Sequence, residues 1–124
     1  SASKIKFERN TLTSDPMRFM DEHRAIAERP ELALGGVTYG WLAATFKSID
    51  ILSGADYAGK IKTPVLIISA GKDRIVSEAA QRAICSVMGK GSFVSIPDSF
   101  HEILKERDAA RKTFWKEFDT FVKR

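Results

Sequence analysis

The sequence predicts an α/β fold in which short parallel strands alternate with helices. Two short runs rich in apolar and β-branched residues, 65–69 and 92–96, have the length and composition of strands, and a stretch with helical periodicity follows each of them. A strand–helix–strand–helix order favours neighbouring parallel strands joined by a right-handed crossover. Each strand leads into a polar loop, one carrying Asp73 and the other carrying His101. These two loops are the most informative part of the chain.

The composition is that of part of a globular protein. The 124 residues are 44% hydrophobic and 29% charged, which can fill one modest core and is not typical of a disordered chain. The single cysteine, Cys85, excludes an intramolecular disulfide and a cysteine-built metal cluster, and it favours a reducing compartment. We predict neither a metal nor a cofactor. The net charge of +4 is spread among acidic residues, so no nucleic-acid partner is predicted.

The first half of the chain predicts two helices. Asp15 can cap the first helix and Pro16 fits its first turn, while the helix is expected to stop before Arg29. Thr38 can cap a second helix, which Ser53 and the glycine after it end. Apolar residues recur on one face of the second helix, so it is expected to pack through that face.

The second half of the chain predicts two strands and two helices. The run 65–69 is apolar almost throughout, as expected for a strand buried on both faces, and 92–96 is the next strand. Ser77 can cap the helix between them, and the closing helix begins near Arg107. The apolar residues predicted on the inner side of the connecting helix are Ala80, Ala83, Ile84, Val87 and Met88.

A sheet of two strands is expected to be incomplete. Two parallel strands leave sheet edges with unpaired N–H and C=O groups, and an apolar strand favours neighbours on either side. We therefore expect an N-terminal part of the same fold, carrying most of the sheet, on chain outside these residues. Pairing with that part is the predicted partnership, and the exposed edge also permits self-association.

An Asp after one strand and a His after the next is the arrangement by which hydrolases hold an imidazole over a nucleophile. No Gly-x-Ser-x-Gly motif occurs in the chain, and Ser69 lies within a predicted strand, so the nucleophile is expected elsewhere. Three alternatives remain open. Asp98 could orient His101 in place of Asp73, Asp73 could serve only as a turn former, and His101 could be an ordinary loop histidine.

Three segments carry a resemblance to the α/β-hydrolase superfamily, and in particular to its lysophospholipase and monoacylglycerol lipase branch. They are the strand-plus-acid segment 63–76, the histidine loop 100–104 and a cap-like segment 35–42. The resemblance covers nearly the whole chain. It implies the C-terminal portion of an α/β-hydrolase fold, with cap or lid helices in residues 1–62. Residues 63–124 would then hold the last two parallel strands and their helices.

The resemblance also implies a function. Asp73 and His101 would be two members of a catalytic triad in a serine carboxylic-ester hydrolase acting on lysophospholipids or monoacylglycerols. The serine and the oxyanion hole would lie outside the chain, which is therefore predicted to be inactive alone. Predicted substrate-binding residues, on the cap and after the acid, are Trp41, Leu42, Phe46, Ile75 and Val76. The alternative for each cap residue is that it packs the cap against the core.

Two other functions remain open. Epoxide hydrolases and dehalogenases share the fold and the acid–histidine pair but use an aspartate nucleophile. A catalytically silent fragment or interaction domain is the other alternative. No apolar run approaches the roughly 20 residues that span a bilayer. We expect a cytoplasmic protein, with peripheral contact at the inner membrane surface permitted.

Overall fold

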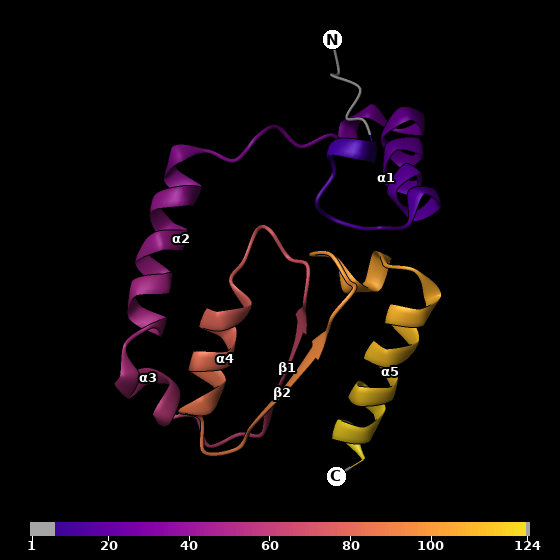
Figure 1. Ribbon diagram of the computed structural model, residues 1–124. Coiled ribbons are helices and arrows are strands. Elements are labelled where there is room, and N and C mark those ends of the chain that lie inside the picture. The colour runs from indigo at the N-terminus through magenta and orange to yellow at the C-terminus, as the bar shows by residue number, and fades with distance from the viewer. Residues whose placement is uncertain (1–6, 124) are drawn as a thin grey trace.

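The computed structural model describes residues 7–123 and consists of a small parallel sheet between two helices, with further helices beyond one end and on one side (Figure 1). The chain forms η1 (Phe7–Arg9), α1 (Pro16–Glu28), η2 (Pro30–Leu32), α2 (Tyr39–Leu52), α3 (Ala55–Gly59), β1 (Val65–Ala70), α4 (Glu78–Ser86), β2 (Gly91–Ile96), η3 (Ile103–Lys105) and α5 (Asp108–Val122), where η marks a short 3-10 helix.

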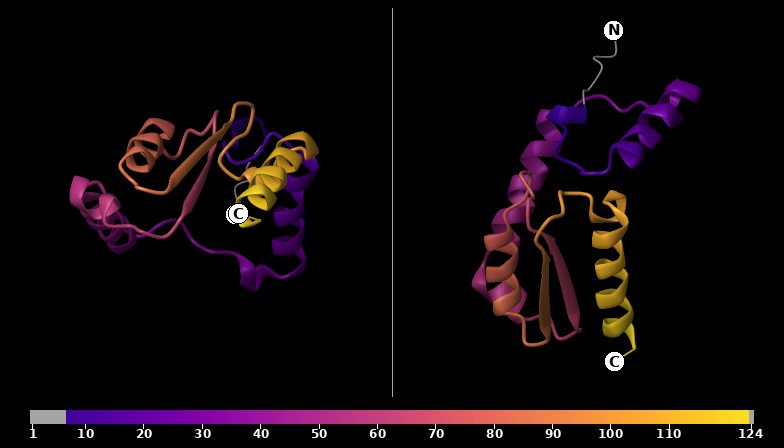
Figure 2. Two further views of the ribbon diagram at one scale, coloured as in Figure 1. Left: turned by 90° about the horizontal axis from the view of Figure 1, so that it is seen from below. Right: turned by 45° about the vertical axis from the view of Figure 1, so that its right-hand side comes forward.

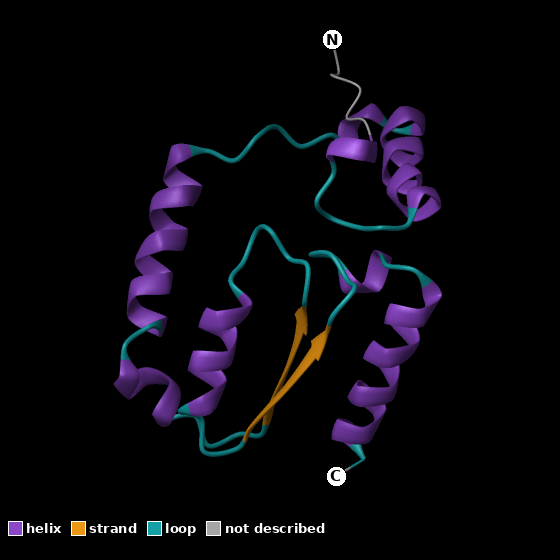
Figure 3. Ribbon diagram, in the orientation of Figure 1, coloured by secondary structure: helices purple, strands orange, loops and turns teal. Residues whose placement is uncertain are grey.

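The sheet confirms the predicted strand–helix–strand–helix unit. β1 and β2 pair in parallel, with Val65 opposite Gly91 and Ala70 opposite Ile96. Helices α4 and α5 each contact both strands, and they cover opposite faces of the sheet (Figure 2). Because the strands run in register, both end at the same level and lead into loops at one edge (Figure 3).

The prediction that β1 is buried on both faces is only partly right. Ser69 and Ala70 are buried, with 2% and 4% of their surface exposed, but the stretch from Val65 to Ile68 is half-buried. Within residues 7–123, β1 pairs along one edge only, so its other edge has no neighbouring strand to cover it.

The predicted helix starts are confirmed by their caps. The Asp15 carboxylate accepts hydrogen bonds from the N–H groups of Met17 and Arg18, at 2.9 and 3.1 Å. The hydroxyls of Thr38 and Ser77 accept in the same way at the starts of α2 and α4. Each cap satisfies N–H groups that have no partner within the helix, which is worth about 1 kcal/mol.

The predicted inner face of α4 is partly wrong. Ala80, Ala83 and Val87 are exposed, whereas Ile84 is half-buried and Cys85 is buried. Residues 81, 84, 85 and 88 are spaced three or four apart and form the face that meets the strands, while the alanines lie beside it. Cys85 is therefore a packing residue, as a small apolar side chain predicts.

The N-terminal helices take two different positions. η1 and α1 lie beyond the carboxyl ends of the strands, whereas α2 and α3 lie on the same side of the sheet as α4 (Figures 1 and 2). α2 packs chiefly against α3, and α3 against α4. Among the described helices, none combines the length and apolar character needed to cross a bilayer.

Gly71 lies where the backbone after β1 passes close to the backbone after β2. A Cβ atom at Gly71 would lie 2.7 Å from both the Cα and the carbonyl oxygen of Pro97, whereas one at Gly89 meets nothing within 4 Å. We expect Gly71→Ala to lower the free energy of unfolding by about 2 kcal/mol, because the backbone must shift to admit the methyl group.

The matched control is Gly89→Ala, which should change stability by no more than about 1 kcal/mol. Urea unfolding of both variants checks the prediction. Equal stabilities would show that the backbone after β1 can move away from Pro97 at little cost.

Candidate active site

The structure brings Asp73 and His101 together. The loops that carry them are joined by backbone hydrogen bonds, from Gly71 N to the Ile96 carbonyl and from Lys72 N to the Ser99 carbonyl, both at 2.9 Å. His101 Nδ1 consequently lies 2.8 Å from Asp73 Oδ2. Two residues predicted from their positions after neighbouring strands therefore form a direct side-chain pair.

The Asp73 carboxylate is fixed at both oxygens. Its Oδ1 accepts hydrogen bonds from the backbone N–H groups of Ile75 and Val76, at 2.7 and 3.1 Å, which leaves Oδ2 for His101. Only 5% of the side chain is exposed. Burial by itself raises the pKa of Asp73, but the hydrogen bonds from Ile75, His101 and Val76 outweigh it, so the pKa lies below the ordinary value. The group is therefore ionised at neutral pH.

The pairing determines which nitrogen of His101 carries the proton. An ionised carboxylate only accepts hydrogen bonds, so Nδ1 must donate and Nε2 of the neutral ring is left as an acceptor. One third of the side chain is exposed, at 33%. Among residues 7–123, no side chain or backbone group hydrogen-bonds with Nε2. His101 is thus oriented to accept a proton at Nε2 from an approaching group.

The nearer acid in the sequence does not orient His101. Asp98 is 87% exposed and forms an ion pair with Lys72 at 2.7 Å. It belongs to a turn in which the buried Ser99 donates from its hydroxyl to the Ile96 carbonyl at 2.8 Å. Asp98 as the orienting acid is therefore wrong. Asp73 also stabilises the turn that follows β1, but it does so through Oδ1, whereas His101 bonds with Oδ2.

Ser69 is not placed to act as the nucleophile for His101. It lies inside β1 with 2% of its surface exposed, and its hydroxyl has no hydrogen-bond partner among the described residues. A nucleophile must meet its base and its substrate at once, which a buried strand position prevents. This agrees with the expectation from the sequence that Ser69 is not the nucleophile.

The N-terminal segment supports the histidine loop from outside. His101 N donates to the Thr11 carbonyl at 3.5 Å, and Glu102 N donates to the Leu12 carbonyl at 2.8 Å. The Thr13 hydroxyl donates to the Lys105 carbonyl at 2.6 Å, and Thr13 is 1% exposed. Residues far apart in the sequence therefore form one structural unit around His101.

Glu106 is the buried centre of this unit. Its carboxylate accepts hydrogen bonds from Ser14 N at 2.9 Å, the Ser14 hydroxyl at 2.5 Å, Phe100 N at 2.8 Å and Arg107 N at 3.2 Å. Burial raises the pKa of Glu106, but these donors together outweigh it and hold the pKa below the ordinary value. Sequence analysis missed Glu106 and Ser14, because no spacing rule links a helix-start signal to a glutamate far along the chain.

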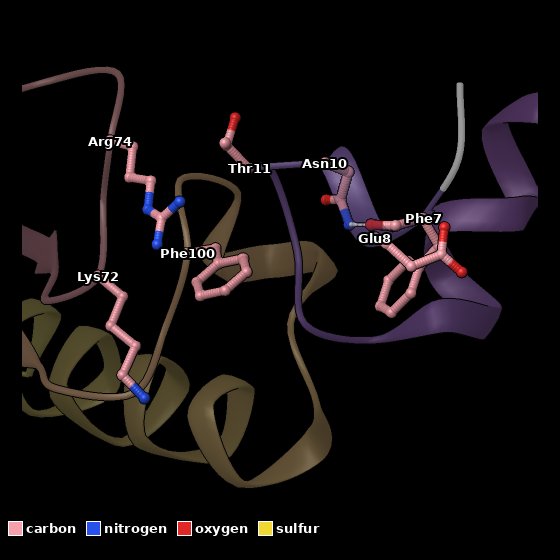
Figure 4. Close-up of a pocket in the computed structure, with 7 residues that line it drawn as sticks. All are labelled: Phe7, Glu8, Asn10, Thr11, Lys72, Arg74 and Phe100. Carbon is pink, nitrogen blue, oxygen red and sulfur yellow. Dashed lines mark hydrogen bonds between the residues drawn. The ribbon is translucent and has the colours of Figure 1, made fainter. Parts of the chain in front are cut away.

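A pocket of about 230 Å³ is lined in part by Lys72, Arg74 and Phe100, which are neighbours of Asp73 and His101 in the sequence (Figure 4). Lys72 and Arg74, the neighbours of Asp73, face Phe7, Glu8 and Asn10 across the ring of Phe100, and Thr11 completes the lining. Sites that enclose drug-sized ligands measure about 300 to 1,000 Å³. The pocket is therefore too small to enclose a long acyl chain.

The five predicted substrate-binding residues lie on two elements, and none of them lines the pocket. Ile75 and Val76 follow Asp73, with 54% and 41% of their surface exposed. Trp41, Leu42 and Phe46 are on α2, where Trp41 is 56% and Phe46 63% exposed and Leu42 is half-buried. The structure brings Ile75 and Val76 to the acid through their backbone N–H groups.

The small parallel sheet and its flanking helices are those of a partial α/β-hydrolase fold. The family described as serine aminopeptidase, S33, matches residues 1–108. The chain belongs to this family, which confirms the resemblance recognised in its motifs.

Among curated proteins, the chain is similar to lysophospholipase L2 of Escherichia coli strain K12. The two are 30% identical over 115 residues, which cover 86% of this chain and 33% of that protein. It is also 28% identical over 115 residues to a probable lysophospholipase L2 of Haemophilus influenzae, covering 93% of this chain and 36% of that protein. The chain spans about a third of the length of the curated relatives it matches.

The lowered pKa of Glu106 predicts a pH dependence of stability. A carboxyl group whose pKa is lower in the folded state stabilises the fold above the ordinary value, about 4.3, and this stabilisation is lost as the pH falls through the folded pKa. We expect Glu106→Gln to lose less stability than the unsubstituted chain between pH 6 and pH 3, measured by urea unfolding.

The exposed Glu28, which no side chain in the described part of the chain contacts by a hydrogen bond, provides the matched control. Glu28→Gln should follow the pH profile of the unsubstituted chain. If Glu106→Gln followed it too, the carboxylate at residue 106 would not be a source of the acid sensitivity.

Proposed function

We propose that this chain supplies the acid and the histidine of a Ser–His–Asp triad in a serine carboxylic-ester hydrolase. The observation that carries the proposal is the Asp73–His101 bond at 2.8 Å, made by a buried carboxylate whose other oxygen is held by backbone N–H groups. Such an arrangement fixes the tautomer of the imidazole and aims Nε2 at a nucleophile. Membership of a hydrolase family supports the same conclusion.

The proposed reaction passes protons through His101. As the serine hydroxyl attacks the ester carbonyl, Nε2 takes its proton, and the resulting imidazolium is stabilised by the ionised Asp73. Collapse of the tetrahedral intermediate breaks the ester C–O bond, and Nε2 returns the proton to the departing alcohol. Water then attacks the acyl-serine by the same route and releases the carboxylic acid. Asp73 stays ionised throughout, as its lowered pKa favours.

The serine and the oxyanion hole must come from chain outside these residues. No Gly-x-Ser-x-Gly occurs in the sequence, and Ser69 is buried within β1. In this fold the oxyanion hole uses the backbone N–H after the nucleophile and another after an early strand. We therefore propose that the 124 residues alone do not turn over substrate, and that residues 1–62 are the cap and 63–124 the end of the catalytic core.

The proposed substrates are lipid esters of the lysophospholipid or monoacylglycerol type. The support is the similarity to two proteins named lysophospholipase L2 and probable lysophospholipase L2. Trp41 and Phe46 give α2 a largely exposed apolar face, and Ile75 and Val76 expose apolar side chains beside the acid. In this proposal these residues contact the acyl chain, which the pocket beside Phe100 is too small to enclose.

The triad proposal predicts opposite behaviour for two aspartates. In the chain produced with the coding sequence immediately upstream, Asp73→Asn should lower kcat for ester hydrolysis by about 10³- to 10⁴-fold, because an amide stabilises the wrong histidine tautomer. In the same assay, His101→Ala should abolish ester hydrolysis, because the group that accepts the serine proton is removed. Asp98→Asn is the matched control and should retain activity, because Asp98 forms only an exposed ion pair with Lys72.

Activity that survives His101→Ala would overturn the triad assignment. Release of fatty acid from lysophospholipid and from monoacylglycerol, measured side by side, reports the substrate class. If neither ester is hydrolysed, an aspartate at the position of the nucleophile would instead favour epoxide hydrolysis or dehalogenation.

The acyl-chain proposal predicts a dependence on chain length. Trp41→Ala should raise KM for long-chain esters by about tenfold, the effect of about 1.4 kcal/mol of lost apolar contact, while KM for short-chain esters stays unchanged. Trp115 on α5 is 46% exposed and serves as the matched control. An equal effect of Trp115→Ala would mean that α2 has no special contact with the acyl chain.

A further inference from the structure

We infer that Glu106 is a positioning residue for His101, holding the histidine loop in place through its buried carboxylate. Its consequence for catalysis rests on the proposed function, but the positioning itself does not. Its carboxylate accepts hydrogen bonds from Phe100, Arg107 and Ser14, and within the described residues it makes none with the imidazole of His101.

The carboxylate links the start of the histidine loop to the start of α5. Oε1 accepts from Phe100 N, the residue before His101, and Oε2 accepts from Arg107 N, where α5 begins. The distances are 2.8 and 3.2 Å. The loop between these residues, with η3 inside it, is therefore closed on itself by one side chain that is 1% exposed.

The same carboxylate binds the loop to the N-terminal segment. Ser14 donates to it twice, from its backbone N–H at 2.9 Å and from its hydroxyl at 2.5 Å. The Arg18 guanidinium also donates to the Glu106 backbone carbonyl. Nearby, the backbone carbonyls of Thr11 and Leu12 accept hydrogen bonds from the N–H groups of His101 and Glu102. The backbone of His101 is thus held on one side by Glu106 and on the other by the segment before α1.

The chemistry of the site requires a carboxylate. All four groups that meet the two oxygens are donors, and an ionised carboxylate is an acceptor at both oxygens. An amide of the same shape would turn an NH₂ group towards one pair of these donors. A buried N–H left without an acceptor is unfavourable, so the loop would shift to find another partner. Such a shift moves the His101 ring relative to Asp73.

The test reads the His101–Asp73 bond directly. The chain contains two histidines, so a His23→Gln variant assigns the His101 signals in an NMR spectrum of the 124-residue chain. In the unsubstituted chain we expect the neutral ring to be protonated at Nδ1, with that proton protected from exchange. In Glu106→Gln we expect exchange to become at least about tenfold faster and the Nε2-protonated form to appear, since about 1.4 kcal/mol of lost bonding is a factor of ten. Glu28→Gln should leave the signal unchanged.

Two variants of Ser14 keep the test decisive if Glu106→Gln does not fold. Ser14→Ala removes one donor to Oε2 and should give a smaller loss of protection in the same direction, whereas Ser14→Thr retains a hydroxyl and should restore it. Circular dichroism checks that each variant is folded. An unchanged Nδ1–H signal in folded Glu106→Gln, an unchanged signal in Ser14→Ala, or no protected signal in the unsubstituted chain would each overturn the inference.

Kinetics separate this inference from the proposed function. With the upstream coding sequence present, Glu106→Gln should lower kcat by about 10²-fold, the effect of a misplacement of about 1 Å, with KM within about twofold. If the NMR signal changes as expected but no ester is hydrolysed, the positioning role stands and the esterase proposal fails. If esters are hydrolysed and neither kcat nor the NMR signal responds to the substitution, Glu106 does not position His101.

Discussion

The parallel pairing of β1 with β2 is the constraint on which the rest of the structure depends. Because the two strands run in register, the loops after them leave the sheet at the same level, and backbone bonds from Gly71 and Lys72 join them. This alignment places Asp73 and His101 within hydrogen-bond distance of each other. A shift of the register by one residue would displace one loop by about 3.3 Å and break their hydrogen bond.

A second set of contacts gives the histidine loop its outer support. Thr13 and Ser14, which precede α1, bond with Lys105 and Glu106, which precede α5. Buried polar groups are stable only when their hydrogen bonds are satisfied, so this cluster specifies one arrangement of the two segments. The residues that begin α1 therefore do more than cap their own helix, because they also support the segment that carries His101.

The acid at residue 73 shows how one side chain can serve local structure and a candidate site together. Its Oδ1 closes the turn after β1, and its Oδ2 remains free to accept from His101. Asp98 is closer to His101 in the sequence, but its carboxylate points to Lys72 at the surface. Distance along the chain is thus a poor guide to the partner of a loop histidine, whereas position after a neighbouring strand is a good one.

The sequence by itself determined the strands, the helix caps and the acid–histidine pair, because each depends on local pattern: β-branched runs, capping side chains and loops after adjacent strands. It could not determine how far β1 is buried, which face of α4 meets the sheet, or that Glu106 and Ser14 join. These features were decided by the tertiary structure. Burial depends on which neighbours cover a strand, and a buried carboxylate finds its donors through space, from segments that no local rule connects.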